Sequence, residues 1–416
     1  MSRKRVGSSR LCVIIFAYGI LKCLSGRTFR TILRIFYQYK TRFHTETRRA
    51  TGFSEKPVFC ALLNGFSIID DYSFLIVQQP REFFIFTRGL VMSLSIRVII
   101  LVATTVYQTL SVWLEEQKAP PGNLVNLGKY RLHFCLAGEA SPTIIIDHSL
   151  GGIEGYFLLE QLSQLARVCI YDRAGYGWSD SSPYPRTSYQ IVQELDQLLT
   201  QAKIEPPYIL VGDSFGSYNV RLYAHLFPEK VVGLVLTDGL HEKRMLKMSP
   251  ALKALKLFFI SGFLMSIIGS ILGIIRVLRV LGVFELLKPE LRRFSPDSRH
   301  RVKRSFCRAK HWMTMSREML NLDQSARQVS EANNFGNLPI VSIKANSFFK
   351  PSLWTRFIPL KSANQLREEM HLELGKLSGD FMEIQADKSS HFVWMDQPDV
   401  MIDAVKILLD KINSVC

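Results

Sequence analysis

The sequence predicts an α/β fold: a mostly parallel eight-stranded sheet with helices on both faces and a helical cap inserted after the sixth strand. Three observations support this prediction. Eight short apolar runs with turn residues at their ends follow one another from about residue 122. Helical patterns separate several of the later runs, and such alternation favours a parallel sheet with helices on both sides. About a hundred residues lie between the sixth and seventh runs.

The predicted strands are, in chain order, NLVNLG, YRLHFCLAG, TIIIDH, ARVCIYDRAG, PYILVGDS, VVGLVLTDG, LPIVSIKA and DFMEIQAD. The first two are expected to form a hairpin. The later ones alternate with helical patterns such as residues 188–202 and 400–412. Residues 122–240 and 338–416 therefore form the predicted core.

Residues 241–337 are predicted to be a helical cap, because a simple connection between a helix and a strand takes about 2–6 residues. The first half of this segment is strongly apolar, and its second half, PELRRFSPDSRHRVKRSF, is basic. The stretch 257–275 is long enough to span a bilayer, which takes about 20 residues. Ser214 lies before this stretch and His391 lies after it, and the motifs described below place both residues in one site. A single crossing would put them on opposite sides of the membrane, so we interpret this stretch as part of a lid.

Residues 1–97 form a basic region without a clear domain pattern. They contain sixteen Lys and Arg against five Asp and Glu. Such a block ahead of an apolar segment is typical of a topology signal rather than of a nucleic-acid surface, so no nucleic-acid partner is expected. Residues 11–21 are too short to span a bilayer. They are interpreted as an interfacial helix, with a signal sequence as the alternative.

Residues 98–114 are predicted to be a single transmembrane helix. Arg97 precedes the segment, and Glu115 and Glu116 follow it. Because positive charge favours the cytoplasmic side, the N-terminus is expected in the cytoplasm and the C-terminal part of the chain, with the predicted sheet, outside it.

The stretch VGDSFGSYNV places Ser214 at a sharp turn between a predicted strand and a predicted helix. Gly212 and Gly216 allow the backbone to turn there, and the amides at the start of the helix face any oxyanion formed nearby. This G-x-S-x-G pattern is weak alone and much stronger between a clean strand and a clean helix.

Several motifs together resemble the α/β-hydrolase superfamily over residues 123–412. They are DHSLGG, YDRAGYGWSD, GDSFG, GLVLTDG and SSHFVWMDQPDVM, in the order that the family shows. The resemblance implies Ser214 as nucleophile and His391 as general base. It also implies an oxyanion hole made by the amides of Phe215 and Leu150, although Ser149 stands where the family usually has glycine.

The acidic partner of His391 is harder to assign. Most members of the family carry it after the seventh strand, but no Asp or Glu occurs between Glu331 and Glu368. Some members carry it after the sixth strand, where Asp238 stands, and we predict Asp238. The alternatives are Asp387 and Asn346.

Other polar residues of these motifs are expected to be structural. Asp172 and Arg173 are predicted to form buried hydrogen bonds, and His148 and His241 to be turn or lid residues. Asp213, a carboxylate next to the nucleophile, is electrostatically unfavourable and stays unexplained by the sequence.

The predicted function is a serine hydrolase that cleaves an ester, with an acyl or lipid-like substrate suggested by the apolar and basic cap. A thioesterase, an amidase, a carbon–carbon hydrolase and a non-catalytic binding scaffold are the alternatives. Epoxide-hydrolase and dehalogenase chemistry is disfavoured, because those enzymes have a carboxylate where Ser214 stands. No cofactor is implied, and the seven cysteines include no CxxC pair of the kind that binds structural zinc. The oligomeric state is left open.

Overall fold

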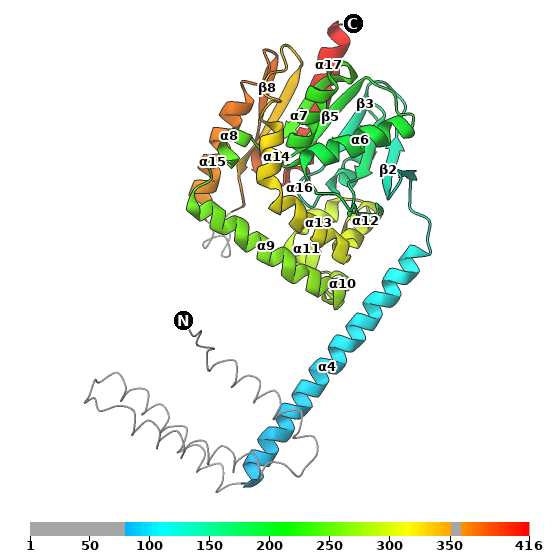
Figure 1. Cartoon of the computed structure of the whole chain (residues 1–416), viewed down its shortest axis with the longest axis vertical. Helices are drawn as coiled ribbons and strands as arrows, with labels where there is room; N and C mark the ends of the chain where they lie inside the picture. Colours follow the sequence, from blue (N-terminus) through cyan, green and yellow to red (C-terminus); the bar gives the residue numbers. More distant parts are fainter. Residues whose placement is uncertain (1–79, 351–358, 416) are drawn as a thin grey trace, which may run out of the picture. The chain divides into compact units, whose positions relative to one another are not determined.

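The computed structural model describes residues 80–350 and 359–415 (Figure 1). The chain divides into two compact units, residues 1–93 and 94–416. The second unit contains the sheet, the cap and most of the first described helix, α4. The expected interfacial helix at 11–21 and most of the basic region 1–97 lie outside the described residues.

Eight strands form one sheet in the order β1-β2-β4-β3-β5-β6-β7-β8. Their bounds are β1 Asn123–Asn126, β2 Arg131–Ala137, β3 Thr143–Asp147, β4 Val168–Asp172, β5 Tyr208–Asp213, β6 Val231–Thr237, β7 Ile340–Ser347 and β8 Phe381–Ser390. The first two strands form the predicted antiparallel hairpin, and β2 also pairs antiparallel with β4. The remaining pairs are parallel. The predicted mostly parallel eight-stranded sheet is confirmed.

Successive residues of the central strands feed two separate apolar cores, one on each face of the sheet. On β5, for example, Leu210 packs into one core, whereas Ile209 and Val211 pack into the other. This follows from the alternation of side chains along a strand, and a parallel strand covered on both faces is apolar in both directions.

Helices cover both faces of the sheet. The first core is closed mainly by α6 and α7, and the second by α17 together with the short η2–α5 segment. The bounds of the helices outside the cap are α4 Pro80–Glu116, η2 Glu154–Phe157, α5 Leu159–Leu162, α6 Ser188–Gln201, α7 Gly216–Leu226, η3 Pro228–Lys230, α15 Leu360–Leu374, α16 Val393–Asp396 and α17 Pro398–Val415.

The insertion between β6 and β7 is helical, as predicted. Its elements are α8 Glu242–Met245, α9 Pro250–Ile271, α10 Ile274–Val280, α11 Val283–Leu287, η4 Pro289–Arg293, α12 Pro296–Phe306, α13 Ala309–Leu320 and α14 Leu322–Val329. Two of these helices begin with a serine cap followed by proline, at Ser249 and Ser295. The serine side chain accepts a free amide of the first turn, and proline fits the first helical position because its missing N–H would be unpaired there.

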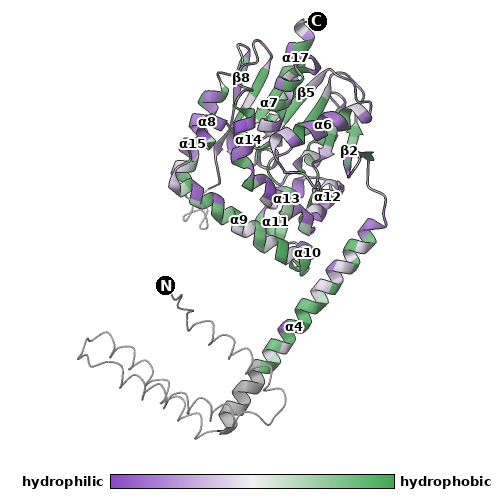
Figure 2. Ribbon diagram, in the orientation of Figure 1, coloured by the Kyte–Doolittle hydropathy of each residue, from purple (hydrophilic) through white to green (hydrophobic). Residues whose placement is uncertain are grey.

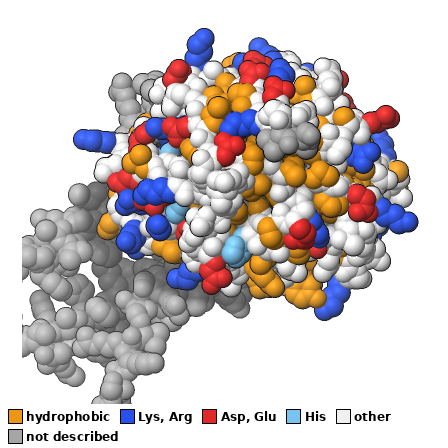
Figure 3. Space-filling view, turned by 90° about the horizontal axis from the view of Figure 1, so that it is seen from above, with side chains coloured by type: hydrophobic (Ala, Val, Ile, Leu, Met, Phe, Trp, Pro, Cys, Tyr) orange, Lys and Arg blue, Asp and Glu red, His pale blue; other side chains and the backbone are white. Residues whose placement is uncertain are grey.

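Two described helices, α4 from Val91 to Glu116 and α9, are long and apolar enough to cross a membrane by length and composition. Both carry apolar residues along most of their length (Figure 2). The face of the molecule in Figure 3, viewed from the top of Figure 1, is different. There Lys and Arg side chains are interspersed with Asp and Glu, as is usual for a surface that faces water.

Candidate active site

Ser214 lies at the tight turn between β5 and α7. Its φ of 50° falls in the left-handed region, which costs energy for any residue other than glycine. A Cβ on Gly216 would lie 2.4 Å from the Asp147 carbonyl oxygen, and one on Gly212 would lie 2.5 Å from a methyl group of Val220. The two glycines therefore let the turn pack tightly against β3 and α7, as the sequence predicts.

The structure brings His391 and Asp238 to this serine. His391 follows β8, and its Nε2 is 2.8 Å from the Ser214 Oγ. Its Nδ1 is 2.5 Å from Oδ2 of Asp238, which follows β6. The three residues come from the carboxyl ends of three parallel strands, the edge where ligand sites of such sheets are found.

The two alternative partners of His391 lie elsewhere. Asp387 is an exposed residue of β8, and Asn346 is an exposed residue of β7. The described residues give neither of them a contact with His391. The geometry therefore favours Asp238 as the partner of the imidazole.

Asp238 is buried, and every contact around it favours the ionised form. Its Oδ1 accepts hydrogen bonds from Arg367, from the Ala345 amide and from His371. Burial alone would raise the pKa of Asp238, but the hydrogen bonds from His371 and His391 and the nearby positive charges hold it well below its ordinary value. A carboxylate that stays ionised can orient His391 and stabilise its protonated ring.

The two predicted oxyanion donors follow neighbouring parallel strands, β5 and β3. The Phe215 amide is the first N–H before α7, and Leu150 lies in the loop after β3. Within residues 80–350 and 359–415, neither amide donates to a protein acceptor. Both are therefore free to bind an oxygen of a substrate.

Arg173 determines how the Leu150 amide points. Its guanidinium donates to the carbonyls of His148 and Ser149, each at 2.7 Å. Because a trans peptide is planar, its N–H points away from its carbonyl, so binding the Ser149 carbonyl turns the Leu150 amide away from Arg173. The sequence did not predict the shape of this loop, because Ser149 stands where the family usually has glycine. In the structure, the hydrogen bonds from Arg173 hold the loop in place.

Comparisons with known proteins agree with this fold. The model of the family described as the alpha/beta hydrolase fold matches residues 142–263, which include Ser214 and Asp238. A protein of Gibberella zeae named "AB hydrolase superfamily protein" is 31% identical over 108 residues, which are 24% of this chain and 34% of that protein. This chain has the α/β-hydrolase fold.

Other similar proteins carry different descriptions: one is a sequence relative from yeast, and two are solved structures. A vacuolar membrane protein of Saccharomyces cerevisiae strain YJM789 is 32% identical over 117 residues, which are 26% of this chain and 18% of that protein. The chain thus spans less than a fifth of the length of this relative. The solved structure of MGS-M2, an α/β-hydrolase enzyme from a deep-sea metagenome library, matches with a TM-score of 0.50 at 14% identity and covers 69% of this chain and 97% of its own. The epoxide hydrolase CorEH matches with a TM-score of 0.50 at 14% identity and covers 70% of this chain and 98% of its own. Identities this low show the fold alone.

In this α/β-hydrolase fold the cap and the oxyanion loop are joined by a buried ion pair. Arg173 pairs with Asp147 of β3 and with Glu318 of the cap helix α13, and all three side chains are fully buried. Tyr176 also donates to Glu318 at 2.7 Å. Arg173 therefore makes buried structural hydrogen bonds, as expected, and it additionally fixes the Leu150 peptide.

Asp213, the carboxylate beside the nucleophile, is kept neutral in this α/β-hydrolase fold. Burial first, and then the negative charges of Glu154 and Asp238, raise its pKa well above its ordinary value. Glu154 accepts a hydrogen bond from the Ser149 amide, which favours its ionised form against the effect of burial. A neutral Asp213 removes the unfavourable charge that the sequence left unexplained.

The two other histidines near strand ends have local structural contacts. His148 is buried, with Nε2 3.1 Å from the Tyr171 carbonyl and Nδ1 accepting from the Gly155 amide. His241 caps α8, and burial lowers its pKa to about 4. Among the described residues, no group of three His, Cys, Asp or Glu side chains is arranged to hold a metal ion.

Sequence reasoning missed two groups of this α/β-hydrolase fold that border the site. Arg367 and His371 lie four residues apart on α15 and both contact Asp238. Two buried basic residues at this spacing share one helix face, and that spacing was the available signal. Glu318 in the cap had no comparable signal, because its partner Arg173 lies far away in sequence.

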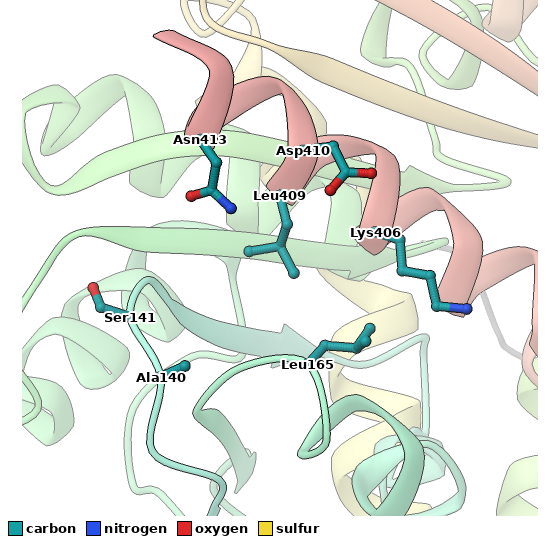
Figure 4. Close-up of a pocket in the computed structure, with 7 residues that line it drawn as sticks. All are labelled: Ala140, Ser141, Leu165, Lys406, Leu409, Asp410 and Asn413. Carbon is teal, nitrogen blue, oxygen red and sulfur yellow. The ribbon is translucent and has the colours of Figure 1, made fainter. Parts of the chain in front are cut away.

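A cavity of about 370 Å³ lies at the other end of the sheet (Figure 4). It is lined by Ala140, Ser141, Leu165, Lys406, Leu409, Asp410 and Asn413. The Ala140–Ser141 turn precedes β3, so this cavity faces the amino ends of the parallel strands. Ser214 and His391 lie at the carboxyl ends, and the cavity is therefore separate from the candidate site.

Proposed function

We propose that this chain is a serine hydrolase that cleaves an ester of an acyl or lipid-like substrate through Ser214, His391 and Asp238. The observation that carries the proposal is the double contact of His391, whose Nε2 is 2.8 Å from Ser214 Oγ and whose Nδ1 is 2.5 Å from Asp238 Oδ2. A serine hydroxyl is a poor nucleophile unless a base lies within hydrogen-bond reach, and this base is oriented by a third group.

In the first half of the reaction, His391 is neutral, with its proton on Nδ1 and directed at Asp238. The lone pair of Nε2 takes the proton of Ser214 while Oγ forms a bond to the ester carbonyl carbon. The carbonyl oxygen becomes an oxyanion and accepts hydrogen bonds from the amides of Phe215 and Leu150. Each such donor lowers the barrier by about 3 kcal/mol.

The tetrahedral intermediate then collapses by breaking the bond to the alcohol oxygen, which takes the proton from His391 Nε2. An acyl group stays on Ser214. In the second half a water molecule gives a proton to His391 and attacks the acyl carbon. The bond to Ser214 Oγ breaks, the serine recovers its proton, and a carboxylic acid leaves.

Aromatic side chains next to His391 support an acyl substrate. Phe348 stacks on the imidazole with ring centroids 5.0 Å apart, and Phe349 lies edge-on to Phe348 at 4.8 Å. Phe392, which follows His391 in the chain, lies 6.1 Å from Phe349. Apolar rings around the reacting atoms favour a hydrocarbon chain over a polar group.

We assign α4 to a membrane as a single span, with the N-terminus in the cytoplasm and the hydrolase domain outside it. This assignment follows from the apolar residues of α4 and from the excess of Lys and Arg in residues 1–97. A similar yeast protein is named a vacuolar membrane protein, which agrees with a membrane location. Residues 241–337 then act as a cap over the core formed by residues 122–240 and 338–416.

The decisive experiment treats the full-length protein in detergent with a fluorophosphonate probe and follows labelling by mass spectrometry. Labelling of Ser214 is expected, and Ser214→Ala is expected to abolish it. A scaffold without catalytic function would leave Ser214 unlabelled in the folded wild-type protein, and that result would overturn the proposal.

A series of esters, thioesters and amides of increasing acyl length then identifies which type of bond is cleaved and which acyl-chain length is preferred. Ser214→Ala, His391→Ala and Asp238→Asn are expected to lower kcat by about 10⁴ each. Asp387→Asn serves as the matched control and is expected to leave kcat unchanged. Near-normal turnover in Asp238→Asn would move the acidic role to another residue.

A further inference from the structure

The cap carries exposed apolar side chains on α9, α10 and α11. These helices follow one another in the chain (Figure 1), and apolar residues predominate in them (Figure 2). We call this set of side chains the cap band. Its members are Leu257, Phe258, Leu264, Met265, Ile268, Ile271, Ile274, Leu278, Val280, Leu281, Leu286 and Leu287. Leu281, Leu286 and Leu287 are each at least 70% exposed. A patch of this kind marks an interaction surface.

The outer face of α9 is apolar although only its inner face packs on protein. The inner face lies on α13, where Phe263 is 6.3 Å from Trp312. The residues that point outward include Leu257, Phe258 and Met265, each about two-thirds exposed. A helix that rests on a domain and faces water has a polar outer face, so α9 is suited to an apolar surrounding instead.

The geometry of the candidate site prevents α9 from crossing a membrane by itself. Ser214 precedes α9, His391 follows it, and the two side chains are in contact. Among the described residues between them, α9 is the only helix long and apolar enough to cross. One crossing would place the two residues on opposite sides, so α9 lies along a membrane surface or away from it.

The cap helix beneath α9 also excludes deep insertion. α13 is bound to the core through the buried pair of Glu318 and Arg173. Thr314 and Met315 of α13 occupy the space next to Gly175 and Gly151 of the core loops. Pulling α9 into the hydrocarbon would carry these buried charges with it, which is costly.

The cap band is continuous with α4. A Cβ on Gly273, at the start of α10, would lie 2.2 Å from the Thr104 carbonyl oxygen, so the two backbones touch. Gln108 donates to the Cys307 carbonyl at 2.7 Å and accepts from Arg276. Arg276 also pairs with Glu115 near the end of α4. These contacts hold residues 104–115 of α4 against the cap, so a bilayer would hold the part of α4 that precedes Thr104, and its surface would lie beside α10.

The charges around the cap band suit an anionic lipid surface. Residues 246–293 contain eight Lys and Arg and two Glu. Both acidic side chains pair within the protein, Glu285 with Lys303 and Glu290 with Lys350. Two of the basic side chains are also paired, Lys256 with Asp323 and Arg276 with Glu115, which leaves six Lys and Arg without an acidic partner among the described residues. Positive charge flanking an apolar helix face is the pattern of helices that lie in the interface of a membrane containing anionic lipids.

Aromatic rings connect α9 to the candidate site. Phe259 on the inner side of α9 is 6.4 Å from Phe349, and Phe349 contacts Phe348, the ring that stacks on His391. An acyl chain that enters beside α9 would therefore contact apolar side chains along its whole path to the imidazole of His391.

We propose that the cap band docks into the interfacial layer of the bilayer that holds α4, and that an acyl lipid of that bilayer passes beside α9 to Ser214. The docking rests on the structure of the cap, whereas delivery of a lipid ester rests on the function proposed above. α9 then has two roles, because its outer face contacts lipid and its inner face borders the path to His391.

The test of docking uses the full-length protein, one copy per nanodisc, in discs of phosphatidylcholine and phosphatidylserine. A water-soluble maleimide is added, and modification is followed peptide by peptide with mass spectrometry, so that native cysteines do not interfere. The variants are Met265→Cys on the cap band and Tyr189→Cys on α6, at two positions where the native side chains are 66% and 50% exposed. The thiol of Met265→Cys is expected to react about tenfold more slowly.

Equal reaction rates at the two positions would overturn the docking. Protection that appears only when two copies share a disc would assign the band to a second copy of this chain, and would also overturn it. The same comparison in discs of phosphatidylcholine alone measures the contribution of the Lys and Arg side chains, and less protection is expected there.

A second experiment tests delivery of the substrate. Phe258→Glu/Met265→Glu is compared with Tyr189→Glu on a long-chain ester held in the disc and on a short-chain ester in solution. The double variant is expected to lose about tenfold of its rate on the long-chain ester and to keep its rate on the short one. Equal losses on both esters would overturn delivery. A wild-type protein that cleaves neither ester would contradict the proposed function, while slow modification of the Met265→Cys thiol would still establish docking.

Discussion

His371 Nε2 lies 3.2 Å from Asp238 Oδ1, the carboxylate oxygen opposite to the one that faces His391. Two imidazoles therefore share one buried carboxylate, and Arg367 is a further positive group on it. Burial alone would lower the pKa of His371, but its hydrogen bond to Asp238 and the nearby carboxylate of Glu383 raise it above the ordinary value. The charged form of His371 is thus favoured, and it offsets part of the negative charge that Asp238 offers to His391.

His371→Gln keeps a hydrogen-bond donor at this position and removes the positive charge. Asp238 then stabilises protonated His391 more strongly, so the acid limb of the kcat/KM profile is expected to move to higher pH. The measurement is ester hydrolysis as a function of pH. His225→Gln, at an exposed position at the end of α7, is the control. A profile for His371→Gln that coincides with that of the wild type would mean that His371 has a purely structural role.

The neutral state of Asp213 predicts how stability depends on pH. The pKa of Asp213 is raised in the folded chain, so folding at neutral pH takes up a proton that the unfolded chain has released. The contribution of Asp213 to stability is therefore lost as the pH rises above about 4, the pKa of an unfolded aspartate, and Asp213→Asn lacks this contribution to the pH dependence. Chemical unfolding should show that Asp213→Asn gains stability relative to the wild type between pH 4.5 and 8. A difference that is constant with pH would contradict a neutral Asp213.

The tight turn at Ser214 predicts that Gly216→Ala is severely destabilising. The new Cβ would lie 2.4 Å from the Asp147 carbonyl oxygen, which is backbone and cannot move aside. A loss of about 3 kcal/mol in the free energy of unfolding is expected, together with loss of fluorophosphonate labelling. Gly262→Ala in the middle of α9 is the matched control, since no atom lies within 4 Å of its Cβ. That change is expected to stabilise the protein by about 0.5–1 kcal/mol.

The buried pair of Arg173 and Glu318 predicts that a change in the cap lowers both the stability of the protein and the activity that depends on the loop after β3. Glu318→Gln removes the cap partner of Arg173, which keeps Asp147 as its ion-pair partner, so a loss of about 1.5–3 kcal/mol in the free energy of unfolding is expected. Because Arg173 also binds the Ser149 carbonyl, kcat should fall as the Leu150 amide shifts. The control is Tyr176→Phe, which removes one hydrogen bond to Glu318 and should cost about 1 kcal/mol. Urea unfolding and steady-state kinetics measure both effects, and equal losses in the two variants would show that the ion pair has no special role.

The sequence by itself determined the fold class and which residues to examine. Alternating apolar runs and helical patterns predict the sheet because burial on both faces requires apolar residues along the whole of a central strand. The short motif around Ser214 is local, since a strand, a tight turn and a helix follow one another within a few residues. The segment around His391 was identified from its resemblance to a family pattern, which is also confined to a few consecutive residues. The roles of Ser214, His391 and Asp238 remain predictions until the experiments above are done.

Only the tertiary structure decided which groups meet. The sequence favoured Asp238 but kept Asp387 and Asn346 as alternatives, because the distance between β6 and the loop after β8 depends on the order of strands in the sheet. Arg367, His371 and Glu318 reach the site from helices that are remote in sequence. Their selection depends on packing, since a buried charge is tolerated only where the fold brings a partner to it. The sequence predicted that α9 is part of a lid because a single crossing would separate Ser214 from His391, and the structure adds the contact between these two side chains.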